Sequence, residues 1–356
     1  MRYLAYIFVL CCIINCSSTD PLIEDDSTTI DSVYFPPIDS DEWESESVSN
    51  LNWDTNALQP LLDFLEQKNS KSFIILYNGK IVVENYFNNH TLESSWYWAS
   101  AGKTLTTALT GIAANEGLLD IDAKISDYIG DGWTDAPTEK ENLITVKHLL
   151  SMTSGLDDSM GQGVSNEDLT YVADAGSRWA YHNVYKKLQD VVASTSNSTW
   201  NNYFNSSLKT KIGMTGAWIE NSDFNVYWSN ARSMARFGLL MANQGNWDGE
   251  QIIPADFLSD ATNTSQNLNK SYGYLWWLNG KSSYRLPQSQ FEFTGSLIPS
   301  APDDMYAALG RDDQKIYVIP SKKLVVIRMG NAADDSNFAL SNFDDEFWIK
   351  IKALIN

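Results

Sequence analysis

Residues 96–106 have the sequence WYWASAGKTLT, in which Ser100 and Lys103 are three positions apart. Residues three apart lie on the same face of a helix, so the Lys103 amine can reach the Ser100 hydroxyl if a helix begins here. A serine hydroxyl is a weak nucleophile and needs a base beside it. A lysine can be that base only when its pKa falls, and burial and the positive end of a helix dipole both lower the pKa. This stretch therefore predicts a nucleophile and its base at the start of a helix.

A second Ser-x-x-Lys pair, Ser206 and Lys209, matches the same pattern. The sequence around each pair separates the two. Three of the five residues before Ser100 are aromatic, and an apolar face with helical spacing begins at Leu105. Ser100 is therefore predicted to lie at the start of a buried helix. Ser206 lies among Asn and Ser residues, which are typical of a solvated surface.

The segment Tyr181-His182-Asn183 is the second candidate for chemistry. A phenol beside an ammonium group can share its proton, and so act as a base or as an acid toward a leaving group. Tyr-x-Asn is a common pattern, and it also occurs at Tyr86 and Tyr203. Each copy, taken alone, indicates packing or a surface position.

In combination the two motifs resemble those of the serine β-lactamase-like, or penicillin-binding-protein-like, hydrolases. This family includes class C β-lactamases, DD-peptidases, certain esterases and the 6-aminohexanoate-dimer hydrolases. Its members carry Ser-x-x-Lys followed by Tyr-x-Asn, and here Tyr181 follows Ser100 by 81 positions. The stretch HLLSMTSGL at 148–156 resembles a further signature of the family. The resemblance covers roughly residues 56–352.

The resemblance implies a role for each matching residue. Ser100 attacks an ester or amide carbonyl, Lys103 takes its proton, and Tyr181 with Lys103 passes the proton to the leaving group. Asn183 holds Lys103 or the substrate amide. Water then resolves the acyl-enzyme, and no cofactor is implied. The substrate is a small-molecule ester, an amide or a peptide.

The family's third motif, Lys-Thr-Gly or His-x-Gly, has no clean copy in this sequence. The equivalent stretch is ALGRDDQK at 308–315, in which Arg311 could supply the positive charge and the Gln314 backbone N–H, with that of Ser100, could bind the oxyanion. Asp312 and Asp313 stand where relatives carry small residues. These carboxylates either turn away from the site or oppose a carboxylate-bearing substrate such as penicillin.

Strand patterns lie at both ends of the body of the chain, and helical patterns lie between them. Asn78-Gly79 between two β-branched runs predicts a hairpin. These patterns favour an antiparallel sheet built from both termini and flanked by helices, with an inserted all-helical lobe over roughly residues 115–260. The resemblance implies that this α+β fold is of the β-lactamase/transpeptidase type. The predicted elements are helices at 56–67 and 344–354 and strands at 72–77, 81–86, 315–319 and 324–328.

The formal net charge is −20, and residues 1–67 hold 13 Asp and Glu against a single Arg2. Such a balance repels phosphate backbones, so no nucleic-acid partner is expected. The acidity belongs largely to the first part of the chain. We predict an acidic tether at 17–52 and a catalytic domain at 53–356, with Tyr34 and Trp43 packed onto that domain.

The three cysteines, Cys11, Cys12 and Cys16, all lie in the first sixteen residues. The apolar run 3–14 is too short to cross a bilayer as a helix, which needs about 20 residues, but it has the length of a signal-peptide core. The sequence IINC ending at Cys16 resembles a lipobox. Residues 1–16 are therefore predicted to be a lipoprotein signal peptide that leaves an exported protein lipid-anchored in the bacterial cell envelope through Cys16. The alternative is an ordinary cleaved signal in which Cys16 has no role.

Other chemistries find little support in the sequence. It contains no Gly-x-Ser-x-Gly elbow, and its three histidines, His90, His148 and His182, show no metal-ligand spacing. His182 as the base of a Ser-His pair remains an alternative. Two other functions also stay open: a β-lactamase or DD-peptidase, and a surface binding protein whose site has decayed at residues 311–313.

Overall fold

Two apolar runs from opposite ends of the chain pair with each other at the centre of the structure. The computed structural model describes residues 32–355, except 160, 222–223 and 336–339. In it, β1 and β13 pair antiparallel from Ser70 opposite Gly330 to Tyr77 opposite Leu324. The sheet that they centre is antiparallel throughout, and its strands are, in spatial order, β2 (Lys80–Tyr86), β1 (Ser70–Tyr77), β13 (Leu324–Gly330), β12 (Gln314–Ile319), β11 (Tyr306–Gly310) and β8 (Trp277–Leu278).

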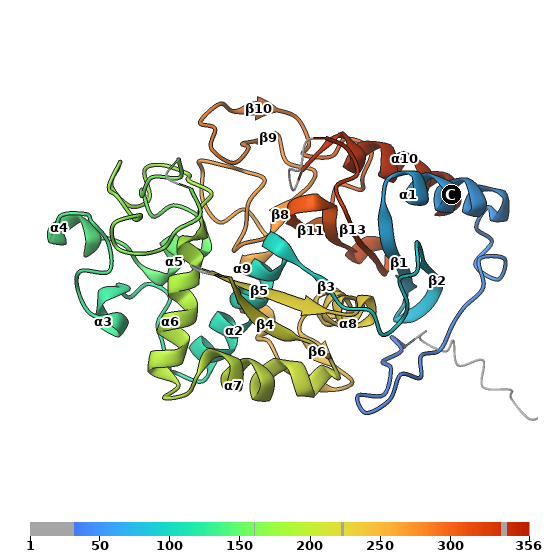
Figure 1. Cartoon of the computed structure of the whole chain (residues 1–356), viewed down its shortest axis with the longest axis horizontal. Coiled ribbons are helices and arrows are strands. Elements are labelled where there is room, and N and C mark those ends of the chain that lie inside the picture. Colours follow the sequence, from blue (N-terminus) through green and yellow to red (C-terminus); the bar gives the residue numbers. More distant parts are fainter. Residues whose placement is uncertain (1–31, 160, 222–223, 336–339, 356) are drawn as a thin grey trace, which may run out of the picture. The chain divides into compact units, whose positions relative to one another are not determined.

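Helices cover both faces of this sheet because successive strand residues point to opposite sides. On β12, Ile316 faces α8 (Ala231–Ala242), which packs against β12 and β13. Its neighbour Tyr317 packs against Phe347 of α10 (Asn342–Ile355), with ring centroids 5.9 Å apart. Helix α1 (Thr55–Gln67) lies beside α10 (Figure 1). The predicted antiparallel sheet from both ends of the chain, flanked by helices, is confirmed.

The lobe between β2 and β8 is mainly helical, but it contains strands that the sequence did not indicate. Strands β4 (Ala217–Asn221) and β5 (Phe224–Ser229) form a hairpin, and β5 also pairs with β3 (Trp96–Tyr97). Buried Trp218 and Tyr227 face each other across this hairpin, which explains its stability. The polar run ENSDFN at 220–225 hides the strand pattern in the sequence. The predicted lobe is therefore not wholly helical.

The remaining elements of the described chain are short apart from two helices. The helices are α2 (Lys103–Asn115), α3 (Ser126–Ile129), α4 (Thr138–Glu141), α5 (Val146–Leu150), α6 (Lys186–Thr195), α7 (Trp200–Phe204) and α9 (Ala255–Ala261), with short helical turns η1 (Ala99–Gly102), η2 (Asn183–Tyr185), η3 (Asn205–Lys209), η4 (Thr210–Ile212), η5 (Arg311–Asp313) and η6 (Pro320–Lys322). The strands are β6 (Asn246–Trp247), β7 (Glu250–Gln251), β9 (Ser283–Tyr284) and β10 (Phe293–Thr294). Within the described residues, no helix has both the length and the apolar character needed to span a membrane.

Residues 33–52 attach to this body rather than standing apart from it. Ser45 forms a parallel bridge with Ile81, and the Trp43 indole donates to the Gly79 carbonyl at 2.7 Å. Gly79 has φ +86°, and a Cβ there would lie 1.8 Å from the Tyr34 carbonyl oxygen, so only glycine fits this turn. Tyr34 and Trp43 pack as expected. The boundary predicted at residue 52 differs from the structure, in which the compact unit begins at Val33. Residues 1–16, with Cys16, lie outside the described residues.

Arg236 is the main polar anchor of this N-terminal segment. Arg236 is only 4% exposed, and its guanidinium lies 5.2 Å from the centre of the Trp43 ring. Because a buried guanidinium needs acceptors for its N–H groups, its position fixes the backbone around it. The four carbonyls that accept its hydrogen bonds belong to Pro36, Pro37, Ser40 and Ile212.

We predict that Arg236→Met destabilises the protein by about 2–4 kcal/mol, because it leaves buried carbonyls without donors. Urea unfolding measures this change, and cleavage by a Glu-specific protease at Glu42, Glu44 and Glu46 should accelerate. Arg311→Met, at a side chain that is 71% exposed, is the control and should change stability by less than about 0.5 kcal/mol. Unchanged stability and cleavage in Arg236→Met would show that other contacts hold the segment.

Candidate active site

Ser100 and Lys103 lie where strand β3 runs into helix α2. Ser100 is in the turn η1, and Lys103 is the first residue of α2. The Lys103 amine donates to the Ser100 hydroxyl with 2.8 Å between Nζ and Oγ. Ala99, just before Ser100, has φ +47°, a left-handed conformation that costs a residue with a Cβ about 1–2 kcal/mol. Such strain is often found beside reacting groups.

The Lys103 amine is almost completely removed from water. The residue is 2% exposed, and burial lowers its pKa from 10.5 to about 7. The rings of Tyr181 and Tyr185 both lie near the amine, with centroids 4.9 and 4.7 Å from Nζ. Near neutral pH a substantial fraction of this amine is therefore uncharged and able to accept a proton.

Tyr181 lies beside the same pair. Burial raises the pKa of its phenol to about 12, and a hydrogen bond with Ser100 opposes part of this rise. Its ring packs against those of Trp277 and Tyr272, whose centroids lie 5.7 and 6.1 Å from its own. These contacts fix the orientation of the Tyr181 ring. The phenol is therefore protonated near neutral pH and can donate to a group that reaches Ser100.

The next two residues of this motif have different surroundings. His182 Nδ1 accepts the Val184 backbone N–H at 3.1 Å, so the neutral ring carries its proton on Nε2. Burial, followed by the charge of Lys103, lowers the pKa of His182. A base in a Ser-His pair needs the opposite tautomer, with Nε2 free to accept the serine proton. The geometry therefore disfavours the Ser-His alternative.

Asn183 is directed toward a loop rather than toward Lys103. Its amide donates to the Gln162 backbone carbonyl at 3.1 Å and to the Gln162 side-chain oxygen at 2.9 Å. Gln162 lines the cavity that contains Ser100, so Asn183 positions a residue of the cavity wall. Its contact with a substrate amide stays a prediction.

The second Ser-x-x-Lys pair has a different geometry. The Ser206 hydroxyl donates to the backbone carbonyls of Asn202 and Tyr203, and the Lys209 amine donates to the Gly216 carbonyl at 3.1 Å. Both side chains thus bind backbone and not each other. This agrees with the surface position that the polar sequence around Ser206 predicts.

The third motif lies at the end of β11, directly against the Ser100 turn. A Cβ on Gly310 would be 2.4 Å from the Trp98 carbonyl oxygen and 3.0 Å from the Ala101 nitrogen, so glycine is required for this approach. Gly310 pairs with Gln314 across the β11–β12 turn. Strand β12, which begins at Gln314, thereby contacts the turn η1 that carries Ser100, while the Gln314 side-chain amide donates to the Asp312 and Gly330 carbonyls.

The two carboxylates of this turn face opposite ways. Asp312 lines the cavity, where the Tyr97 hydroxyl donates to it at 2.5 Å. Asp313 is 1% exposed and pairs with the Lys315 amine at 3.1 Å, away from the cavity. Arg311 also lines the cavity, but its side chain is 71% exposed and lies 3.8 Å from Asp312. It is an exposed surface cation only weakly engaged by its neighbour.

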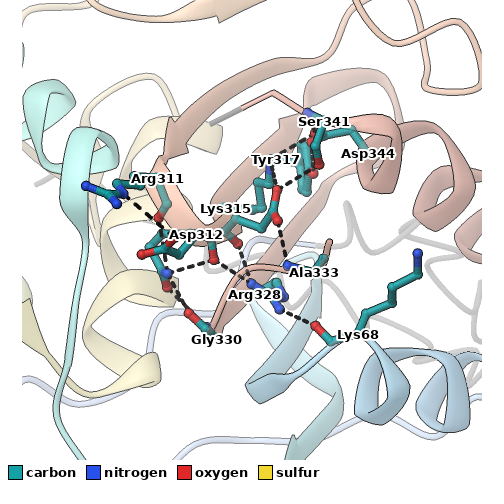
Figure 2. A network of polar contacts seen from close by, with 12 residues as sticks. Lys68, Arg311, Asp312, Lys315, Tyr317, Arg328, Gly330, Ala333, Ser341 and Asp344 are labelled. Atoms are coloured by element: carbon teal, nitrogen blue, oxygen red, sulfur yellow. Dashed lines mark hydrogen bonds and ion pairs between the residues drawn. The ribbon is translucent and has the colours of Figure 1, made fainter. Parts of the chain in front are cut away.

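A buried polar network supports the turn from behind (Figure 2). Lys315 also pairs with Asp344 at 2.9 Å, and Arg328 donates to the backbone carbonyls of Asp312 and Asp313 at 2.9 Å each. Burial would raise the pKa of Asp313, but Lys315 and the Ala333 N–H hold it below the ordinary value. Asp312 and Asp313 have φ of 60° and 61°, so these contacts stabilise a turn that residues with a Cβ disfavour.

One cavity of about 820 Å³ is lined by Ser100, Lys103, Tyr181, His182, Arg311 and Asp312, whereas Asn183 and Gln314 are not among its lining residues. Sequence reasoning identified Ser100, Lys103, Tyr181 and Arg311 among its lining residues. It missed those brought in by separate loops and by the β3-β5-β4 sheet: Tyr97, Asp158, Tyr185, Ile219, Val226, Trp228 and Gln288. Of these, Tyr97 and Tyr185 lie within four positions of a motif residue, and this proximity in the sequence could have identified them as candidates for the site. In the described part of the chain, no group of three or more His, Cys, Asp or Glu could hold a metal ion.

Comparisons with known proteins agree with this architecture. The model of the beta-lactamase family matches residues 64–345. Curated proteins give no match to this sequence.

Three solved structures share the fold. A candidate 6-aminohexanoate-dimer hydrolase from Bacillus anthracis has a TM-score of 0.69 at 20% identity, covering 90% of this chain and 89% of its own. A candidate beta-lactamase from Bacteroides dorei has a TM-score of 0.68 at 13% identity, covering 85% and 99%. EstCE1, a hydrolase with promiscuous acyltransferase activity, has a TM-score of 0.64 at 13% identity, covering 87% and 99%. Since the family model spans most of the sequence, this chain belongs to the beta-lactamase family and has the serine-hydrolase fold of that family.

Proposed function

We propose that this protein is a serine hydrolase that cleaves an ester or amide through an acyl-enzyme on Ser100. The observation that carries the proposal is the 2.8 Å contact between the Ser100 hydroxyl and an amine whose pKa burial lowers to about 7. An uncharged amine at that distance can take the serine proton as the oxygen attacks. A chain whose site had decayed would have no reason to keep this buried amine in place.

In the acylation step, Ser100 Oγ forms a bond to the substrate carbonyl carbon while Lys103 takes the hydroxyl proton. The negative charge moves to the carbonyl oxygen, and the backbone N–H groups of Ser100 and Gln314 are the proposed donors to it. The close approach of Gly310 to the Ser100 turn supports this pairing of donors. The carbon–leaving-group bond then breaks, Tyr181 donates its proton to the leaving oxygen or nitrogen, and Lys103 returns a proton to Tyr181.

Deacylation follows the same path with water as the nucleophile. Water adds to the acyl carbon and gives a proton to the Lys103 amine, which is uncharged again once it has reprotonated Tyr181. The bond from the carbon to Ser100 Oγ breaks, and the proton returns to that oxygen. The products are the free acid and the original enzyme, so the cycle consumes one water and needs no cofactor.

The charges in the cavity favour an ester or amide over a β-lactam or a peptidoglycan peptide. Glu220 and Asp312 line the cavity, as does Asp158, which is paired with Arg178 at 2.6 Å, and the exposed Arg311 is the candidate partner for a substrate carboxylate. A β-lactam or a peptide with a free terminus would bring its carboxylate toward these like charges. We therefore place ester or amide hydrolysis first and β-lactam hydrolysis second.

Our first functional prediction concerns pH. Because Lys103 accepts the proton only when uncharged, kcat/KM should rise with pH and reach half its maximum near pH 7, the pKa to which burial lowers the amine. The Tyr181 phenol, with its pKa raised to about 12, should cause no decline below about pH 10. Hydrolysis of p-nitrophenyl butyrate from pH 5 to 9 measures the profile. A profile that is flat, or that falls over this range, would contradict the role of Lys103.

The second prediction separates the two Ser-x-x-Lys pairs. Ser100→Ala should lower kcat/KM for p-nitrophenyl esters at least about 1000-fold, because the attacking oxygen is lost. Ser206→Ala, its matched control, should keep wild-type activity, since the Ser206 hydroxyl only binds backbone carbonyls.

Intact mass after treatment with a fluorophosphonate should show one adduct in the wild type and in Ser206→Ala, and none in Ser100→Ala. Equal esterase activity in wild type and Ser100→Ala would refute the assignment. Rapid nitrocefin hydrolysis would instead favour the β-lactamase alternative.

We also propose that the protein is exported and lipid-anchored in the bacterial cell envelope through Cys16. The apolar run 3–14 and the IINC sequence that ends at Cys16 support this proposal. The acidic segment after Cys16 would then link the lipid to the body, which begins at Val33.

We expect Cys16→Ser to move the protein from the membrane fraction to the soluble exported fraction, because the acylated thiol is lost. Its purified esterase activity should equal that of the wild type. Cys12→Ser is the neighbouring control and should stay with the membrane. A Cys16→Ser protein that still fractionates with membranes would argue against the anchor.

A further inference from the structure

One face of the small sheet β3-β5-β4 carries a row of apolar side chains. Tyr97 lies opposite Trp228, and Ile219 lies opposite Val226. Residues that face each other across antiparallel strands share one side of the sheet, and alternate residues along a strand share it as well. These four residues, here called the apolar wall, therefore lie on one side. Trp218 and Tyr227 lie on the other side and are buried in the core.

The apolar wall faces the cavity and not the core. All four of its residues line the cavity that contains Ser100. The Tyr97 and Trp228 rings contact each other with centroids 5.4 Å apart, while Ile219 remains 49% exposed. Single exposed apolar residues are ordinary on protein surfaces, but a contiguous set across three strands inside a cavity indicates a binding surface.

The wall is continuous with the reacting group. Tyr97 ends β3, and the next residues form the η1 turn that carries Ser100. A group attached to a carbonyl at Ser100 can therefore lie along the wall without leaving the cavity. At about 820 Å³ the cavity has the size of pockets that enclose drug-sized ligands, so it has room for an extended group.

Carboxylates lie at the edges of the wall. Glu220 follows Ile219 in the sequence, and Asp312 accepts a hydrogen bond from the Tyr97 hydroxyl. Both line the cavity, so a substrate group with its own negative charge would meet like charges beside an apolar surface. An uncharged group can instead bury apolar area against the wall.

We infer that the apolar wall binds an uncharged aliphatic or aromatic group of the substrate, on the acyl side or the leaving-group side of the scissile bond. This inference rests on the proposed hydrolysis at Ser100 and names the substrate class of that site: hydrophobic esters or amides. Ile219 and Trp228 determine the preference because they extend the surface away from Ser100.

Two substrate series test the inference and distinguish the two sides. The first consists of p-nitrophenyl esters with acyl chains of two to eight carbons, and the second of acetate esters of alcohols with two to eight carbons. In one series kcat/KM should rise about two- to fourfold per methylene, the gain expected when a methylene leaves water for an apolar surface. A flat dependence on chain length in both series would overturn the inference.

Two exposed isoleucines provide a matched pair of variants. Ile219→Asp puts a charge on the wall and should lower kcat/KM for the eight-carbon substrate at least tenfold more than for the two-carbon one. Ile349→Asp makes the same change at a residue of α10 that is 57% exposed. It should leave the slope of kcat/KM against chain length as in the wild type. Both variants should fold, because neither buries the new carboxylate. Equal slopes in the two variants would remove Ile219 from the binding surface.

A binding experiment separates failure of this inference from failure of the proposed hydrolysis. In Ser100→Ala, one of two amide pairs should show a preference of at least tenfold by tryptophan fluorescence: octanamide over butanamide if the wall binds the acyl side, or N-octylacetamide over N-butylacetamide if it binds the leaving-group side. The added Ile219→Asp change should abolish the difference. If no ester is hydrolysed but this preference is present, the chemistry at Ser100 is wrong and the wall stands. If esters are hydrolysed and the preference is absent, the wall is wrong and the chemistry stands.

Discussion

Lys103 holds an amine 2.8 Å from the Ser100 hydroxyl in a place where only 2% of the residue is exposed. Moving an ammonium group from water into such a place costs several kcal/mol, so the amine gives up its charge more easily than a lysine in water. The fold supplies this burial by surrounding α2, since every residue from Lys103 to Ala113 is buried. A helix buried on all sides has to sit at the centre of its lobe, with other elements packed around it.

That central position explains how the polar residues of α2 are accommodated. A buried hydroxyl is costly unless it is hydrogen-bonded. The Thr104 hydroxyl donates to the Ala101 carbonyl, and the Thr107 hydroxyl to the Tyr274 carbonyl. The Gln189 amide of α6 donates to the Thr106 hydroxyl at 3.1 Å. The contacts of Thr107 and Thr106 come from segments far apart in the chain, so the position of Lys103 depends on the assembled lobe and not on the helix alone.

The parts that sequence predicted are those with local signals. The Asn78-Gly79 turn, the strands at each end and the pairing of Ser100 with Lys103 depend on residues within a few positions of each other. The β4–β5 hairpin escaped prediction because polar residues at its tip hide its alternation, and its partner β3 has only two residues. The network behind Asp313 could not be predicted either. It joins β12, β13 and α10, and no spacing in the sequence indicates that Lys315, Arg328 and Asp344 meet.

The central sheet also has a consequence for when the protein can form. Ser70 on β1 contacts Arg328 on β13, and these residues are 258 positions apart. At typical rates of synthesis the ribosome needs on the order of 10–50 s to make the intervening chain. During that interval β1 lacks its second neighbour β13, and a hairpin without a third strand is marginally stable in water. Completion of the sheet therefore waits until β13 has been made, long after β1. The order of translation, and any factor that shields β1 in the meantime, is thus part of the biogenesis of this protein.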